Sequence, residues 1–256
     1  MDKRIGAQLY TLRDYCKTIE DVDKTYKKVS EIGYKTLQVS GVNLELSGKE
    51  LKEAADRYGL ETICTHRPYD EFTGDLDKLI KYHKDLGCSI AGLGAAPWTL
   101  RKDIDGLKAF IKDFNKISAE LKKEGITFGY HNHAFEFAKV DGKFVMDYLI
   151  EETDPESFNF ILDVYWLSFA GIDPAKFIRK MGKRAMIIHF KDIKANTNNS
   201  VSICEVGQGN IDWDNVIAAC EDAGCKAAMV EQDTCERDPF DCMKTSYDFL
   251  SEKGFN

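Results

Sequence analysis

The sequence predicts an α/β protein built as one (β/α)8 barrel of the TIM type, with a single domain over residues 1–256. Eight short apolar runs alternate with helical patterns, and each run is apolar on both faces, as expected of parallel strands that are covered on both sides. Several helical segments end at a glycine just before the next run. Eight alternations in 256 residues favour a closed barrel, with an open doubly wound sheet as the alternative.

The individual elements follow from local patterns. Ser47-Gly-Lys-Glu50 is a capping box that opens one helix, and apolar residues at helical spacing from Ile104 to Leu121 mark another. The polar segment Ala195–Ser202 is expected to be a surface loop. The glycines that end helices are Gly33, Gly59, Gly87, Gly125 and Gly224. The predicted strands are Ile5–Tyr10, Thr36–Val39, Glu61–Thr65, Ser89–Leu93, Thr127–His131, Asn159–Asp163, Ala185–Phe190 and Ala227–Glu231.

Composition narrows the class of protein. The net charge is −8, from 35 basic and 43 acidic residues, which argues against a nucleic-acid partner because phosphates require a basic face. The longest apolar runs are too short to span a membrane, and the N-terminus lacks the apolar stretch of a signal peptide, so a cytoplasmic location is expected. The eight cysteines contain no CxxC pair and are expected to be reduced.

Ionisable residues gather at the predicted carboxyl ends of the strands, where a TIM barrel places its active site. Four of the five histidines fall there, and His83 alone lies in a helix. So many polar groups around one ring destabilise a barrel unless they pair or bind something, and mixed imidazole and carboxylate groups suit divalent transition ions. We therefore predict a metal site, with a hydrogen-bonded ring without metal as the alternative. The residues concerned are His66, His131, His133, His189, Asp163 and Glu231.

Several motifs, taken in chain order, resemble the xylose isomerase-like TIM barrel superfamily and, within it, the sugar phosphate isomerase/epimerase group. They are Gly6–Arg13, Tyr130–Phe137, Leu162–Trp166, His189–Asp192, Gly207–Asp212 and Val230–Asp233. The resemblance covers essentially the whole chain. It implies a homodimer and one divalent ion, most often Mn²⁺, with Co²⁺, Zn²⁺ or Mg²⁺ as alternatives. Endonuclease IV shares this fold, but it resembles the chain less and requires a surface that accepts DNA.

The resemblance also implies the metal ligands, which are two Glu, one Asp and one His. Asp163, His189 and Glu231 match by position. Ketose epimerases of this superfamily place the remaining Glu within strand five, where this chain has Gly129-Tyr130. Glu136 is therefore the expected fourth ligand, with His131 or His133 as alternatives.

The expected function is that of a metal-dependent isomerase or epimerase of a small sugar or keto-sugar. Such an enzyme removes a proton next to a carbonyl and forms a metal-stabilised enediolate. Glu136 and Glu231 would exchange the proton on the two faces of the substrate, and Lys191 would stabilise the negative charge. The residues expected to bind substrate are Gln8, Arg13, His66, Trp98 and Trp166.

Other interpretations stay open at this point. His131 and His133 could act as general acids on a leaving group, which would suit a dehydratase or lyase of the inosose or 3-keto sugar type. A barrel that binds sugar without turnover, or that serves as a subunit of a complex, is an alternative of another class. Lys191 and Asp192 could form a simple ion pair, and Arg67 could be a surface residue.

Overall fold

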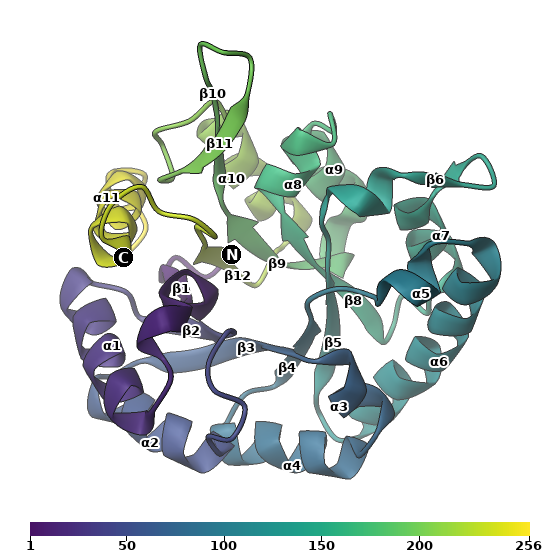
Figure 1. The fold of residues 1–256 in the computed structure, drawn as a ribbon, viewed down its shortest axis with the longest axis horizontal. Helices are drawn as coiled ribbons and strands as arrows, with labels where there is room; N and C mark the ends of the chain where they lie inside the picture. The colour runs from purple at the N-terminus through teal and green to yellow at the C-terminus, as the bar shows by residue number, and fades with distance from the viewer.

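The computed structural model describes residues 1–256 and contains eight parallel strands that close into a barrel, in the order β1-β12-β9-β8-β5-β4-β3-β2 (Figure 1). This confirms the predicted fold, and each barrel strand coincides with one of the eight predicted runs to within a few residues. The strands are β1 Gly6–Gln8, β2 Thr36–Val39, β3 Glu61–Arg67, β4 Ile90–Leu93, β5 Thr127–His131, β8 Phe158–Asp163, β9 Ala185–Phe190 and β12 Ala227–Val230.

Helices surround the barrel as an outer ring (Figure 1). In the longest, α6, the predicted apolar stripe packs inward and buries Leu107, Phe110 and Phe114. The predicted capping box of α2 is present, since Ser47 and Glu50 cap each other's backbone. No helix is long and apolar enough to cross a membrane. The α-helices are α1 Ile19–Ile32, α2 Gly48–Arg57, α3 Tyr69–Thr73, α4 Leu76–Leu86, α5 Trp98–Arg101, α6 Ile104–Lys123, α7 Val145–Glu152, α8 Val164–Phe169, α9 Pro174–Met181, α10 Trp213–Ala223 and α11 Pro239–Glu252.

Short 3-10 helices follow three of the strands or helices: η1 Leu9–Tyr15, η2 Ala134–Phe137 and η3 Gly182–Arg184. The first of them shortens β1, which was expected to run to Tyr10. The Gln8 side chain turns back and accepts a hydrogen bond from the Tyr10 backbone N–H at 2.8 Å, and this starts η1. Tyr10 is therefore carried onto the rim of the barrel rather than along a strand.

The barrel interior has an apolar lower part and a polar upper part. Seven buried residues fill the lower part: Cys64, Ile90, Ile161, Met186, Ile187, Ala227 and Met229. Two residues further along the same strands, the inward positions carry His66, Asp163, His189 and Glu231, because side chains alternate between the two faces of a strand. These seven residues form a packed apolar plug inside the barrel, and the polar residues of the site lie directly above it.

Two small hairpins decorate the rim, β6 Lys139–Val140 with β7 Lys143–Phe144, and β10 Asp192–Ala195 with β11 Val201–Cys204. The second projects beyond the ring of helices in Figure 1. The expected surface loop Ala195–Ser202 was therefore wrong at both ends, because Ala195 pairs with Val201 and Lys194 with Ser202.

Asp192 anchors this hairpin to the barrel. Its carboxylate accepts hydrogen bonds from the backbone N–H groups of Gly207 (2.9 Å) and Gly209 (3.1 Å) and from Trp213 Nε1 (2.7 Å). A Cβ at Gly209 would lie 2.3 Å from the Asp192 carboxylate, so this close approach requires glycine. The Gly207–Gly209 turn therefore wraps a buried carboxylate.

Replacing this carboxylate should destabilise the fold. Asp192→Ala leaves several buried donors without an acceptor, each costing about 1–3 kcal/mol, so we expect a loss of roughly 3 kcal/mol or more in the free energy of unfolding. The matched control is Asp248→Ala, which removes an exposed ion pair with Lys244 worth at most about 1 kcal/mol. Urea unfolding measures both. Equal stability of the two variants would contradict the anchoring role.

Candidate active site

Four side chains from four adjacent strands meet at the carboxyl end of the barrel. His131 ends β5, Asp163 ends β8, His189 lies in β9, and Glu231 follows β12. All four are buried, and one potential ligand atom from each lies within 4.8 Å of the others. His66 of β3 forms a second such group with His131 and His189. The structure therefore brings together the three residues predicted most firmly as ligands, with the imidazole of His131 as the fourth member of the group.

Neighbouring groups hold one atom of each of three ligands and leave the other facing the centre. Gln8 Nε2 donates to Glu231 Oε1 at 2.8 Å, and the Trp166 backbone N–H donates to Asp163 Oδ1 at 3.1 Å. His189 Nε2 lies 2.8 Å from the amide oxygen of Gln38, while its Nδ1 lies 2.9 Å from Glu231 Oε2. Such outer hydrogen bonds orient metal ligands in proteins.

Several polar atoms in this region make no hydrogen bond, although Asp163 Oδ2 lies 3.4 Å from the Lys191 ammonium. Asp163 Oδ2, His131 Nδ1, His66 Nε2 and His133 Nδ1 are buried and make no hydrogen bond. A buried polar atom without a partner costs free energy, so four in one place indicate that a ligand completes the site. Imidazole nitrogens and carboxylate oxygens are donors that divalent transition ions accept, and the set therefore fits a metal ion.

Lys191 brings a positive charge to the edge of this group. Its buried ammonium lies 2.7 Å from Asp233 Oδ2, 3.4 Å from Asp163 Oδ2 and 3.5 Å from Glu231 Oε2. Burial opposes the charge, but the three carboxylates hold the pKa of Lys191 above its ordinary value. The alternative of a simple pair with Asp192 was wrong, because Asp192 faces the turn described above.

Glu136 does not belong to the group of ligand atoms. It lies in η2, wholly buried, and accepts hydrogen bonds from Tyr130 Oη and from the His133 backbone N–H, both at 2.7 Å. Tyr130 is an outward residue of β5 that packs against Phe110 of α6, so Glu136 sits between the barrel and its helices. Burial raises the pKa of Glu136 to about 8 despite these bonds.

Strand five offers no inward carboxylate either. A Cβ at Gly129 would lie 2.9 Å from Ile161 Cγ1, so the position that a strand-borne ligand would use is filled by the apolar plug. The next inward position along β5 is His131. Its neighbour His133 also lines the cavity, and the two imidazole rings lie 4.7 Å apart.

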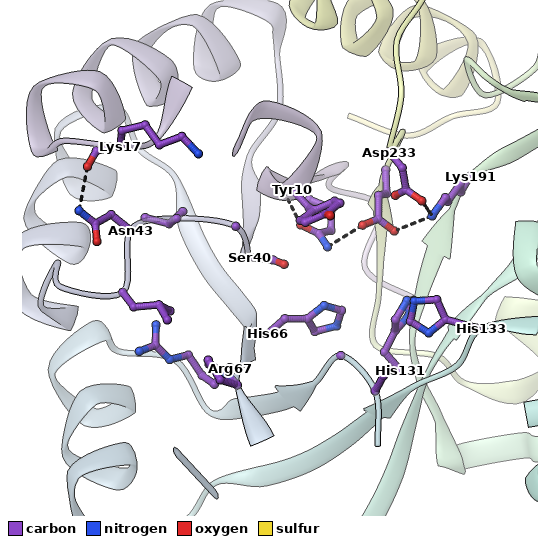
Figure 2. Close-up of a pocket in the computed structure, with 18 residues that line it drawn as sticks. Tyr10, Lys17, Ser40, Asn43, His66, Arg67, His131, His133, Lys191 and Asp233 are labelled. Atoms are coloured by element: carbon purple, nitrogen blue, oxygen red, sulfur yellow. Dashed lines mark hydrogen bonds and ion pairs between the residues drawn. The ribbon is translucent and has the colours of Figure 1, made fainter. Parts of the chain in front are cut away.

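A cavity of about 720 Å³ opens above the centre, within the size range of small-molecule sites. Figure 2 shows His66, His131 and His133 pointing into it, with Lys191 and Asp233 along one side. Most of the residues that line it are polar, and the lining extends over Tyr10, Ser40 and Asn43 to Arg67.

The other predicted substrate-binding residues are placed differently. Gln8 and His66 line the cavity, whereas Trp98 stands on the rim outside it with 65% of its surface exposed. Trp166 lies behind His133, with ring centroids 5.4 Å apart. Arg13 donates to the backbone oxygens of Tyr10 (2.7 Å) and Asp233 (3.0 Å) and thus supports the cavity wall.

Arg67 is not a surface residue. It is buried and forms a two-pronged ion pair with Glu71, with both hydrogen bonds at 2.7 Å. Its side chain therefore forms a wall of the cavity between the barrel mouth and α3.

Burial sets the charge of the remaining histidines. It lowers the pKa of His66 to about 3 and of His133 to about 4, and together with His189 it holds the pKa of His131 well below its ordinary value. At His189 burial is outweighed by Glu231 and Asp163, which raise the pKa to about 9. In return Lys191 and His189 hold the pKa of Glu231 well below its ordinary value, against the effect of burial.

Sequence reasoning missed three supporting residues: Gln38, Asn132 and Asp233. Asn132 Oδ1 accepts from the Asp163 backbone N–H at 3.0 Å, and Asp233 pairs with Lys191. Alternation along the strand could have identified Gln38. Thr36 lies beside the inward Gly6, and Gln38, two residues further along, points to the same inward face.

The fold and site together define a class, the TIM barrels that carry a polar, metal-suited centre at the carboxyl rim. The family model for the xylose isomerase-like TIM barrel matches residues 26–253, and the chain belongs to this family. It is similar to the inosose dehydratase of Bacillus cereus (strain AH820), with 25% identity over 216 residues that cover 75% of this chain and 71% of that protein.

Two solved structures from Parabacteroides distasonis, each described as a sugar phosphate isomerase/epimerase, share the fold. One superposes with a TM-score of 0.83 at 23% identity and covers 97% of this chain and 93% of its own. The other has a TM-score of 0.78 at 27% identity, with 97% and 98% coverage. The relatives are thus named as an inosose dehydratase and as sugar phosphate isomerases/epimerases.

The histidine pKa values predict acid sensitivity. Unfolded histidine has a pKa near 6.5, whereas burial lowers the pKa of His66 to about 3 and the pKa of His83 and of His133 to about 4, and holds the pKa of His131 well below its ordinary value. Below pH 6.5 the unfolded chain therefore binds more protons, and stability falls by about 1.4 kcal/mol per pH unit for each histidine. The pKa of Glu136, raised to about 8, opposes this by at most one proton, and the raised pKa of Asp233 acts in the same direction, so a net loss remains with four histidines on the other side.

Urea unfolding of the chelator-treated protein at pH 7, 6 and 5 measures this effect. Of these four histidines, His83 is the one that lies outside the cavity. His83→Gln should make the pH dependence shallower. A free energy of unfolding that stays constant from pH 7 to pH 5 would contradict the prediction.

Glu136 should behave as a structural acceptor and not as a ligand. Glu136→Gln keeps one acceptor oxygen, so we expect a loss of about 1 kcal/mol in stability and a metal affinity within roughly threefold of the wild type. Asp163→Asn, which alters the centre itself, should lose at least about tenfold in affinity. Competition titration with a chelating dye measures both, and equal losses would return Glu136 to the ligand set.

Proposed function

We propose that this chain is a divalent-metal-dependent enzyme that removes a proton next to the carbonyl of a small keto-polyol and then expels a hydroxyl group from the neighbouring carbon, as a dehydratase does. The observation that carries the proposal is that buried atoms of Asp163, His131, His66 and His133 lack a hydrogen-bond partner, and that the three histidines line one cavity. A bound divalent ion would supply a Lewis acid that polarises the carbonyl. Asp163, His189, Glu231 and His131 would hold it.

Polar groups around the cavity suit a substrate that is rich in hydroxyl groups. Ser40 and Asn43 line one side, and the ring of Tyr10 lies over the Arg13 guanidinium at 4.3 Å. Such a ring offers a flat apolar wall with a hydroxyl at its edge, which suits the mixed surface of a polyol. The proposed partner is accordingly a small polyol and not a polymer.

Lys191 is the group placed to stabilise developing negative charge. Its ammonium is wholly enclosed beside Asp163 and Glu231 and lines the cavity. Asp233 fixes it at 2.7 Å, so the charge is oriented before substrate arrives. Preorganised charge of this kind is the largest single contribution to many reactions that form an oxyanion.

Elimination is favoured over epimerisation by the position of Glu136. Exchange of a proton on two faces of a substrate requires two groups, and the expected carboxylate pair is not assembled, because Glu136 lies behind β5. His133 remains, because it lines the cavity and its Nδ1 has no hydrogen-bond partner. One imidazole can take the proton from carbon and return it to the departing hydroxyl, which leaves as water. The similarity to inosose dehydratases supports the same outcome.

Turnover of a panel of inososes and 3-keto sugars in heavy water tests the proposal. We expect loss of water, dependence on an added divalent ion after chelation, and a drop of about 10²-fold or more in kcat/KM for His133→Asn. Trp98→Ala, outside the cavity, is the matched control and should keep full activity. A recovered epimer that carries deuterium, without dehydration, would instead support isomerisation.

A further inference from the structure

We propose that the centre selects borderline ions, Zn²⁺ or Co²⁺, over Mn²⁺ and Mg²⁺, because imidazoles of His131 and His189 share it with only two carboxylates. The inference rests on the proposed function, since it concerns the same site. It departs from the manganese ion that the family resemblance implies.

Strand five contributes a nitrogen donor to the centre for a steric reason. The inward position before His131 is Gly129, and Ile161 fills the space that a longer side chain would need there. His131 thus becomes the strand-five member of the group, with its ring 4.6 Å from His189 and 4.9 Å from His66 between centroids. Its Nδ1 is buried and unpartnered.

The other nitrogen donor is oriented by its surroundings. The amide oxygen of Gln38 accepts from His189 Nε2 at 2.8 Å, so Nδ1 is the nitrogen directed at the carboxylates. That nitrogen lies 2.9 Å from Glu231 Oε2 and 3.8 Å from Asp163 Oδ2. Two nitrogens and two oxygens therefore face one point, with a third imidazole, His66, beside them.

The charge around the centre points to the same class of ion. Mg²⁺ and Mn²⁺ prefer sites rich in carboxylates, carbonyls and water. Here the two carboxylates also face the Lys191 ammonium at 3.4 and 3.5 Å, which weakens the negative potential on which such oxygen-seeking ions depend. Imidazole donors favour Zn²⁺ and Co²⁺ over Mn²⁺, whose preferred ligands are carboxylates, carbonyls and water.

Competition titration of the chelator-stripped protein with Zn²⁺, Co²⁺ and Mn²⁺ tests the inference. Zn²⁺ binds most sites more tightly than Mn²⁺, so the informative quantity is the ratio of their affinities in wild type against His131→Asp. We expect this ratio to fall at least about tenfold in His131→Asp and to stay unchanged in His133→Asn. X-ray absorption of the Zn²⁺-loaded wild type should show two or more imidazoles, and His131→Asn, which tests the same donor without adding charge, one fewer.

The outcomes separate the two proposals. An unchanged affinity ratio and an unchanged imidazole count in the His131 variants would overturn the nitrogen-rich centre, while ion-dependent dehydration would leave the proposed function intact. Failure of the protein to bind any of the three ions, with activity indifferent to chelation, would overturn both.

Discussion

Enclosure of charge by a closed barrel is the constraint on which this site depends. Glu231, His189 and Lys191 are removed from water by the surrounding strands, and none could remain charged there alone. Glu231 stabilises both cations, His189 at 2.9 Å and Lys191 at 3.5 Å, and Gln8 and Gln38 form hydrogen bonds with the atoms that point away. Removing one ionic partner would leave an uncompensated buried charge. Removing one of the outer amides would leave a buried atom of Glu231 or His189 without its hydrogen bond.

The barrel itself could be predicted from the sequence because its strands are buried on both faces and its helices end at glycines with positive φ. These are local signals that act within one β-α unit. The same pattern predicted the site residues only where they lie within the strands. Asp163 and His189 are strand residues, and alternation fixes the direction of their side chains.

Beyond the strand ends that rule no longer applies. Glu136 and Trp98 lie in short helices of the rim, and their direction depends on turns set by side-chain hydrogen bonds from elsewhere in the fold. Glu136 is held by Tyr130, whose side chain points outward from the barrel. The number of residues between His131 and Glu136 therefore does not predict whether Glu136 faces the barrel interior. The Asp192 turn is similar, since its donors lie 15 to 21 residues away.

Strand five shows how a change in packing can redirect chemistry on an unchanged fold. Ile161 occupies the space beside Gly129, so a polar side chain does not fit at that inward position. The next inward position along the strand is His131, which carries the polar group instead. The centre therefore has no carboxylate from strand five, and Glu136 lies outside the group. Both the proposed preference for elimination and the proposed preference for borderline ions follow from this placement of His131 inside the group and of Glu136 outside it.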